Sequence, residues 1–172
     1  MPAALVLALA LVADPGPVAP PLAERFAAAV SLSTAAGQAE RELYDEAVRL
    51  MLIAPTGRAL AERLLGRPRP VVVEFADLES IGGSAEMSGP VARVVLGRGL
   101  LQWRGQWAGM VAAEVLAHEL LGHVLSNRQA QEAGVGWEFA GMLADEVNAQ
   151  VVGWLVGLEA GWRFLDPWAE LL

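Results

Sequence analysis

The stretch His118-Glu119-Leu120-Leu121-Gly122-His123 holds both histidines of the chain, with one acidic residue between them. Catalytic zinc sites use three protein ligands, typically imidazole and carboxylate, and keep a further position for water. The concentration of the chain's imidazoles in six residues therefore predicts a metal site, with one zinc ion per chain. The alternative is that these polar side chains pack against or cap a helix without binding metal.

The spacing of the two histidines predicts an irregular helix. The usual zinc signature places two histidines four residues apart, on one face of an α-helix. Here the second follows five residues after the first, and on a regular α-helix this separates them by about 140°. A π-type turn closes over five residues and would return both imidazoles to one face. Gly122 is compatible with that turn because it has no side chain to clash.

HELLGH resembles the H-E-x-x-G-H metal motif of the dipeptidyl peptidase III family, which are zinc peptidases of the zincin or gluzincin type. That family carries a second motif, E-E-C-R-A-E/D, and the corresponding residues here, starting at Asp145, read DEVNAQ. The resemblance implies that His118, His123 and Glu146 are zinc ligands. It also implies that Glu119 is the catalytic base and that Asp145 hydrogen-bonds a ligand imidazole.

Two positions of the second motif depart from the family pattern, because Asn148 replaces an arginine and Gln150 replaces an acid. The rest of the family's chain, including the second lobe that completes its cleft, has no counterpart in these 172 residues. The resemblance therefore implies a zinc site and peptide-bond hydrolysis, but not dipeptide release. It leaves open whether the cleavage is exo or endo.

Spacing along the chain separately favours Glu146 as the third ligand. If two long helices turn back near Val135, His123 lies 12 residues before the turn and Glu146 lies 11 after it. At about 1.5 Å per residue, both are about 17 Å from the turn and so level in an antiparallel pair. Glu138 would lie too close to the turn, and Glu159 would lie beyond the site.

Apolar periodicity and turn residues predict an α+β fold, mostly helical with a small antiparallel sheet. The valine-rich runs 71–75 and 91–96 are typical of strands, and the Gly/Ser-rich segment 80–89 between them predicts a long loop. We expect 91–96 to be the edge strand, where an extended peptide can pair with the backbone. The predicted helices cover 22–36, 39–53, 58–65, 107–133 and 137–161, and the last two are the metal-binding helices of a zincin-like domain.

The first 21 residues differ in composition from the rest. Residues 2–13 are apolar and uncharged, and 14–21 contain four of the ten prolines. We therefore expect an apolar segment and linker over 1–21 and a single zincin-like metallopeptidase domain over 22–172. The apolar run is either a buried strand or helix start, or a weak export signal without a positive residue before it. The expected location is the cytoplasm, with export as the alternative.

Charge and cysteine content exclude several classes of function. The chain has 20 acidic residues and 12 basic ones, giving a net charge of −8, which argues against a nucleic-acid partner. It has no cysteine, so disulfides, cysteine-ligated metals and thiol catalysis are excluded. The apolar runs 2–13 and 147–158 are shorter than the roughly 20 residues of a membrane span, so we expect no transmembrane helix. The oligomeric state is not predicted.

Peptide hydrolysis also needs a group that stabilises the oxyanion. Tyr44, the only tyrosine, and Arg98 are candidates for this role or for substrate contact, and the alternative is a surface role. The tryptophans are expected to pack in the core or at helix ends, with a substrate wall or membrane contact as the alternative; they are residues 103, 107, 137, 154, 162 and 168.

We therefore expect a zinc-dependent peptidase in which a zinc-bound water attacks a peptide bond and Glu119 is the general base. Its partner is a peptide or protein substrate. Two alternatives stay open. One is a non-catalytic protein in which zinc stabilises two helices, and the other is an exported or membrane-associated protein with a secondary metal site.

Overall fold

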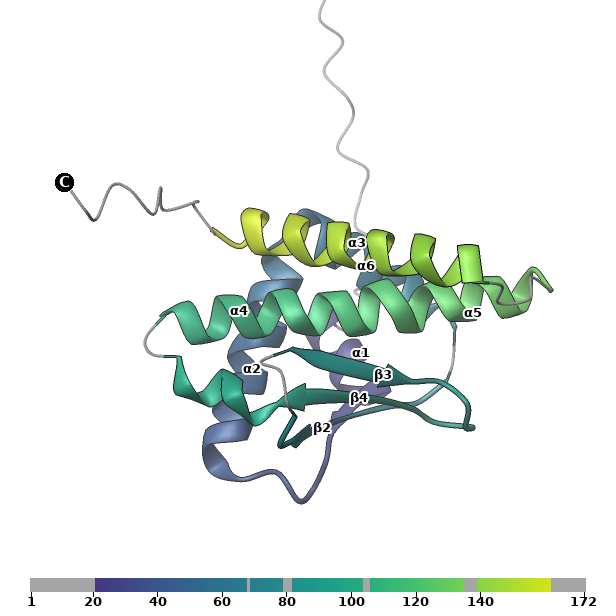
Figure 1. Ribbon diagram of the computed structural model, residues 1–172. Coiled ribbons are helices and arrows are strands. Elements are labelled where there is room, and N and C mark those ends of the chain that lie inside the picture. The colour runs from purple at the N-terminus through teal and green to yellow at the C-terminus, as the bar shows by residue number, and fades with distance from the viewer. Residues whose placement is uncertain (1–20, 68, 79–81, 104–105, 135–138, 162–172) are drawn as a thin grey trace, which may run out of the picture.

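The computed structural model describes residues 21–67, 69–78, 82–103, 106–134 and 139–161, and it has an α+β fold (Figure 1). The N-terminal apolar run and three of the tryptophans, at positions 137, 162 and 168, lie outside the described residues. The elements, in chain order, are α1 (Leu22–Ala29), β1 (Val30–Leu32), α2 (Gln38–Ile53), α3 (Pro55–Leu65), β2 (Val71–Ala76), β3 (Gly83–Glu86), β4 (Ala92–Gly97), the 3₁₀ helix η1 (Arg98–Gln102), α4 (Gln106–Leu116), the π-helix η2 (Ala117–Val124), α5 (Leu125–Glu132) and α6 (Phe139–Glu159).

The sheet is mixed, with strand order β1-β2-β4-β3, so the prediction of an antiparallel sheet is wrong. The two valine-rich strands β2 and β4 are parallel, with Val71 opposite Ala92 and Ala76 opposite Gly97. Among the described strands, only β3 runs antiparallel, alongside β4. After β2 the chain passes to β3 and runs back along it, so that β4 enters between them in the direction of β2. Near-continuous valine-rich runs are typical of parallel strands buried on both faces, a signal that the sequence prediction did not use.

The prediction that residues 91–96 form the edge strand is also wrong. Strand β3 lies at the edge of the sheet, and β4 lies between β2 and β3. The segment 80–89, predicted as a loop, contains β3. Strand β4 lies between two neighbours, with Val94 and Leu96 fully buried. Small residues without β-branching gave β3 no recognisable strand pattern, and its pairing with β4 supplies the order that the local sequence lacks.

Two helix boundaries differ from those predicted. Helix α1 ends at Ala29, and the chain continues into β1, which pairs in parallel with β2 from Val30 opposite Val71. Pairing to a sheet therefore overrides the helical periodicity after Ala29. Helix α3 begins at Pro55, because proline suits the first turn of a helix, where its missing N–H needs no partner.

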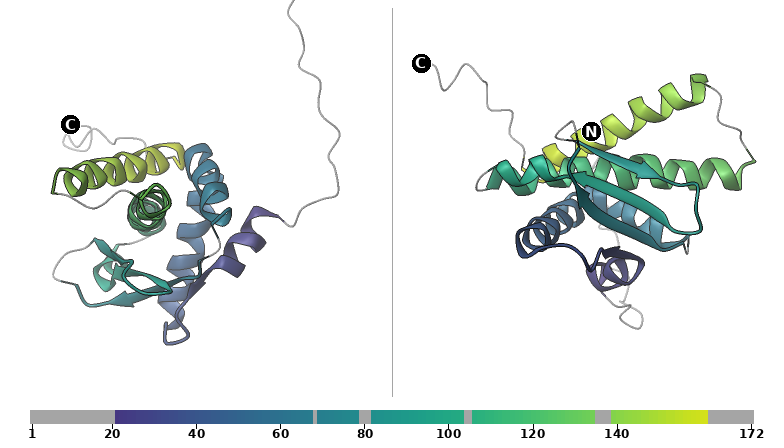
Figure 2. Two further views of the ribbon diagram at one scale, coloured as in Figure 1. Left: turned by 90° about the vertical axis from the view of Figure 1, so that its right-hand side faces the viewer. Right: turned by 60° about the horizontal axis from the view of Figure 1, so that its bottom comes forward.

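The segment α4–η2–α5 forms one long helix through the centre of the fold, with the sheet on one side and α6 on the other (Figures 1 and 2). Its residues Leu116 and Leu120 are fully buried in the hydrophobic core. Helices α2 and α3 cover a further side, as the left view of Figure 2 shows. The metal-motif segment therefore lies in the interior layer, where neighbouring elements hold its backbone.

By length and composition, one helix among the described residues could cross a membrane. It spans Trp107–Glu132, and its most apolar window has a mean hydropathy of 1.3. Of that window, 67% is buried inside the fold. The central helix of a globular core meets the same criteria, so this feature is weak evidence for a membrane span.

Candidate metal centre

The six residues of the histidine motif lie on a π-helix, as their spacing predicted. The π-helix η2 covers Ala117–Val124 and continues α4 into α5 without a break. The wider turn brings the two imidazoles together. The Nε2 atoms of His118 and His123 are 3.2 Å apart, and the rings meet edge to face with centroids 4.8 Å apart.

Gly122 has a second role that the spacing argument did not identify. Helix α6 crosses η2 so closely at this point that a Cβ on Gly122 would lie 2.5 Å from the Cβ of Ala149 and 2.6 Å from its Cα. Gly153, one turn further along α6, packs in the same way against the Cβ of His118, where a Cβ would come within 3.3 Å. Small residues at the crossing therefore set how near α6 comes to the imidazoles.

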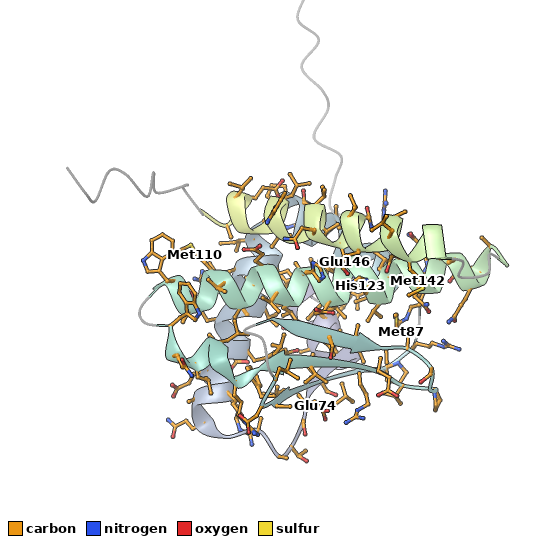
Figure 3. All side chains as sticks on the ribbon, in the orientation of Figure 1. Glu74, Met87, Met110, His123, Met142 and Glu146 are labelled. Carbon is orange, nitrogen blue, oxygen red and sulfur yellow. The ribbon has the colours of Figure 1, made fainter. Side chains whose placement is uncertain are left out.

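Glu146 of α6 faces both imidazoles. Its Oε1 lies 3.5 Å from Nε2 of His118, and its Oε2 lies 3.3 Å from Nε2 of His123. Figure 3 shows Glu146 and His123 pointing toward each other between α6 and the long helix. The structure therefore places Glu146 level with the histidines, as the residue count around the turn predicted.

The separations among these three side chains can be compared with a zinc coordination sphere. Ligand atoms at about 2.0–2.1 Å from zinc in a tetrahedral arrangement are about 3.3–3.4 Å apart. The three observed separations are 3.2, 3.3 and 3.5 Å. Within the described residues, His118, His123 and Glu146 form a group able to hold a metal ion, and its donor types and spacing fit zinc.

Asp145 orients one of the imidazoles. Its Oδ2 lies 2.6 Å from Nδ1 of His123. An ionised carboxylate can only accept a hydrogen bond, so Nδ1 of the ring donates and the lone pair of the neutral ring is left on Nε2, which faces the group. The other oxygen, Oδ1, is buried without a hydrogen-bond partner among the described residues. The contact that the family resemblance implied for Asp145 is therefore present.

Glu119 is buried beside the group, with 4% of its surface exposed. Its Oε1 lies 4.0 Å from Nε2 of His118. Burial raises the pKa of the Glu119 carboxyl to about 7, with Glu146 adding to the increase and His123 opposing it. Burial also lowers the pKa of His118, with the neighbouring His123 as the second cause. The two residues thus favour their uncharged forms in the absence of a cation.

The edge strand β3 lies directly against Glu119. A Cβ on Gly83 would lie 2.8 Å from Cγ of Glu119 and 3.0 Å from the Val115 side chain. The sequence prediction missed this neighbour because it treated the segment as a loop. The available signal was the pair Gly82-Gly83, since glycine within a strand often marks a close approach of another part of the chain.

The structure does not bring the two oxyanion candidates to this group. Tyr44 is buried in the core, and its hydroxyl donates to the carbonyl of Val30 at 3.2 Å. Burial also raises its pKa. Arg98 pairs with Glu40 at 2.7 Å and with Asp77 at 3.2 Å. Both candidates therefore have structural partners elsewhere in the fold.

The three tryptophans within the described residues differ in environment. Trp107 packs partly buried against the core, as predicted for this residue type. Trp103 is 43% exposed and lies at the end of η1, one of the two places expected. Trp154 is 53% exposed in the middle of α6, so the expectation of packing in the core or at a helix end is wrong for this residue.

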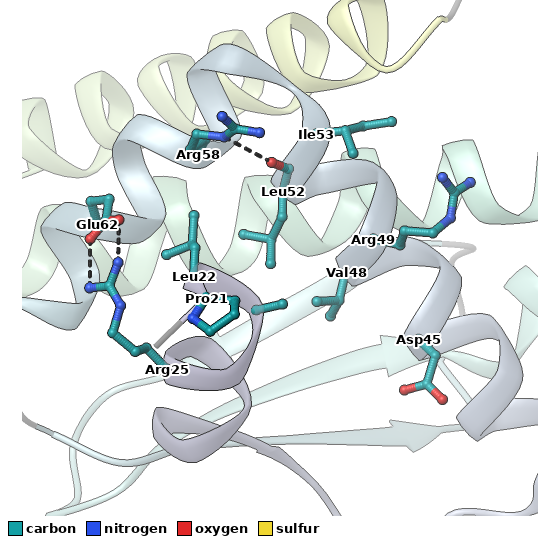
Figure 4. Close-up of a pocket in the computed structure, with 11 residues that line it drawn as sticks. Pro21, Leu22, Arg25, Asp45, Val48, Arg49, Leu52, Ile53, Arg58 and Glu62 are labelled. Atoms are coloured by element: carbon teal, nitrogen blue, oxygen red, sulfur yellow. Dashed lines mark hydrogen bonds and ion pairs between the residues drawn. The ribbon is translucent and has the colours of Figure 1, made fainter. Parts of the chain in front are cut away.

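A cavity of about 650 Å³ lies between α1, α2 and α3, with Leu22, Val48 and Leu52 among its walls (Figure 4). A double hydrogen bond between Arg25 and Glu62 closes one side of it. None of the residues that line this cavity belongs to the histidine group. The cavity therefore adds no chemistry to the candidate metal centre.

Comparisons with protein-family models, with curated proteins and with solved structures found no match to this chain. The functional argument therefore depends on the geometry of the group and on its motif.

Proposed function

We propose that this chain is a zinc-dependent peptidase, with His118, His123 and Glu146 as zinc ligands and Glu119 as the general base. The observation that carries the proposal is the agreement between the three ligand-atom separations, 3.2 to 3.5 Å, and the edges of a zinc tetrahedron. The resemblance of HELLGH and DEVNAQ to the motifs of dipeptidyl peptidase III supports the same assignment. A zincin-like fold is part of the proposal.

The number of protein ligands supports a catalytic site over a structural one. Structural zinc sites are usually closed by four protein ligands, whereas catalytic sites use three and keep a position open. The described residues supply three, and the side chain of Glu146 is 58% exposed. Solvent therefore reaches the group from the side of α6.

Zinc held there would supply Lewis acidity, lowering the pKa of bound water to roughly 7 and polarising a carbonyl. Glu119 would accept the proton of the attacking water on its carboxylate and pass it to the leaving amine. Asp145 holds the His123 ring so that Nε2 faces the group. Together these residues would account for activation of the water and for the proton transfer, while neither oxyanion candidate, Tyr44 or Arg98, reaches the group.

The edge strand β3 supports a peptide as the substrate. Strand β3 lies beside Glu119 and, among the described residues, pairs through one side only, with β4. An extended peptide can add to such an edge through main-chain hydrogen bonds. We assign this role to β3 in place of the strand over 91–96.

The test separates metal binding from catalysis with Glu119→Gln and Glu146→Gln. Zinc content and melting temperature are measured for each, and cleavage of a peptide library is followed by mass spectrometry. Glu119→Gln should keep zinc and stability while hydrolysis falls by about 100-fold or more, because an amide cannot accept the proton. Glu146→Gln should lose zinc affinity first, and activity should partly return with added zinc.

The matched control is Glu132→Gln, a glutamate at the end of the same long helix that pairs with Arg67 instead of the histidines. It should retain both zinc and activity. Wild-type hydrolysis by Glu119→Gln would exclude Glu119 as the base. If the wild-type chain binds zinc but cleaves nothing, the non-catalytic protein with zinc between two helices is the better description.

A further inference from the structure

The outer face of α6 exposes most of the large apolar surface in the described chain. Nine large apolar side chains are exposed among the described residues, and seven of them belong to α6. Their exposed fractions range from 39% to 60%. Six of the seven share one face of the helix and are here called the α6 stripe: Leu143, Val147, Val151, Trp154, Leu155 and Leu158. Met142 lies about 180° around the helix from Val151 and is not part of the stripe.

The spacing within the α6 stripe is that of a helix-packing seam. Val147, Val151, Trp154 and Leu158 follow one another at intervals of four, three and four residues, the alternation that keeps side chains on one line of a helix. The opposite face of α6, with Ala149 and other buried residues, packs on the long helix. In Figure 1, α6 lies at the outside of the fold. The stripe is thus a second packing face whose partner is not among the described residues.

The acidic residues of α6 do not interrupt the stripe. Asp145 and Glu146 belong to the histidine group. The carboxylate of Glu159 accepts hydrogen bonds from the backbone N–H and hydroxyl of Thr56, both at 2.7 Å, at the start of α3. No charge therefore opposes close packing along the stripe.

The exposed area is sufficient for a dimer. The six side chains of the stripe, each about half exposed, present on the order of 550 Å², and a standard interface buries about 800 Å² per partner, of which about 65% is apolar in homodimers. A typical monomer's largest apolar patch is about 300–600 Å². The stripe therefore lies at the upper end of what a monomeric surface leaves uncovered.

The stripe is also complementary to itself. If two copies of α6 pack antiparallel about Val151, Val147 of one copy lies opposite Leu155 of the other, and Leu158 lies opposite Ala144. Each large side chain then faces a smaller one or one of similar size. A twofold axis through Val151 satisfies the requirement that the same patch serves both copies.

The charge distribution favours a second copy over a lipid surface. Helices that lie on membranes usually carry lysine or arginine on their polar face. Helix α6 contains neither, and the whole chain has a net charge of −8. The stripe therefore lacks the basic flank that draws such helices to anionic lipid, whereas packing against an apolar helix face on another copy requires none.

We propose that the chain forms a twofold dimer through the α6 stripe. The histidine group lies to one side of that interface, because Glu146 is offset from Val147 by about 100° around the helix. Pairing therefore covers the outer face of the helix that supplies Glu146 and leaves the group open. The proposal does not depend on peptidase activity.

The absence of cysteine makes a direct cross-linking test possible. In the full chain, Val151→Cys places one thiol at the expected twofold axis, where mild oxidation should form an intermolecular disulfide. Ile53→Cys is the matched control, because Ile53 is 50% exposed but lies on α2. Cross-linking should be efficient for Val151→Cys and at background for Ile53→Cys. Equal cross-linking in both variants, or none in either, would overturn the proposal.

Light scattering after size exclusion gives the second measurement. The wild-type chain should have a mass of about 36 kDa, twice its 18.2 kDa. Val151→Glu should raise the dimer dissociation constant by at least about 100-fold with zinc content unchanged, while Ile53→Glu should remain dimeric. A monomeric wild type would overturn the proposal. If that monomer floats with phosphatidylcholine vesicles, lipid covers the α6 stripe. If it does not float, another segment of the same chain covers the stripe.

Discussion

Around His118 and His123, three carboxylates surround two imidazoles, whereas around Arg98 two carboxylates share one guanidinium. In the first group, no arginine pairs with Glu119, Asp145 or Glu146 within the part of the chain that the structure describes. In the second, Glu40 and Asp77 both pair with Arg98. The first group holds excess negative charge with lone pairs directed inward, so a divalent cation would complete it.

The comparison shows why only one of the two groups is a functional candidate. A guanidinium that is already paired with two carboxylates stabilises the fold, and its charge and hydrogen-bond donors are less available to a substrate. Burying several imidazoles and carboxylates side by side costs folding free energy when no cation is among them. A bound metal ion would offset that cost. Perturbed acid–base groups in an open site are accordingly a marker of function. The predictions below test this difference.

The largest expected effect is on zinc stoichiometry. Wild-type protein purified without chelator should contain one zinc per chain, and His118→Ala or His123→Ala should contain almost none. Each substitution removes one of three ligands, so zinc affinity should fall by more than the roughly 100-fold found when only an outer partner is lost. Metal analysis by mass spectrometry measures the content. Arg98→Ala is the control and should keep one zinc; full occupancy in the histidine variants would refute the site.

The second prediction concerns the approach of α6. Gly122→Ala should destabilise the fold by about 1–3 kcal/mol, because its new Cβ would overlap Ala149 and force the helices apart. Zinc affinity should fall with it. Gly141→Ala, on the same α6 with no atom within 4 Å of the added Cβ, should be neutral or slightly stabilising. Urea denaturation gives both values, and equal stability of the two variants would contradict the close crossing.

The third prediction concerns the orientation of His123. Asp145→Asn should weaken zinc binding by about 10- to 100-fold, because the amide no longer fixes the ring proton on Nδ1 as an ionised carboxylate does. Competition with a chelating dye measures the affinity. Asp77→Asn, at the carboxylate paired with Arg98, is the matched control and should leave zinc affinity unchanged. Identical effects in both variants would indicate a nonspecific effect of charge.

The smallest expected effect is on the Arg98 group. Pairing with Arg98, together with the Gly37 N–H, lowers the pKa of Glu40, so this carboxylate stabilises the fold above the pKa of its unfolded state. The contribution is lost as the pH falls through the lower folded-state value. Glu40→Gln should therefore cost about 1 kcal/mol at pH 7, and the difference from wild type should shrink below about pH 4. Chemical denaturation of both proteins at pH 7 and below about pH 4 tests this. A stability difference that does not change with pH would exclude the ion pair as its cause.

Local spacing was sufficient to predict the metal motif. Five residues between two histidines require a wider turn if both imidazoles are to share one face, and η2 is that turn. Equal distances from the turn between the two long helices put Glu146 level with His123, and the structure places them 3.3 Å apart. Both predictions succeeded because the rise and rotation of a helix are fixed by its backbone hydrogen bonds.

The pairing of strands was not predictable in the same way. Runs of valine identify β2 and β4 as strands, but their direction depends on where the chain passes between them. The short strand β3 lacks β-branched residues, and only its hydrogen bonds to β4 order it. The role of Tyr44 was likewise undetermined, because the nearest acceptor for its hydroxyl, the carbonyl of Val30, is distant in sequence.

The sequence by itself therefore determined the helical character of the chain, its two valine-rich strands and the histidine motif of the candidate metal centre. The tertiary structure decided that the sheet is mixed, that β3 and not β4 lies at the edge beside Glu119, and that Arg98 is paired elsewhere. It also decided that one face of α6 stays exposed. The physical reason is range: helical turns and ligand spacing depend on neighbours within a few residues, whereas strand order, ion pairing and burial depend on contacts between segments far apart in the chain.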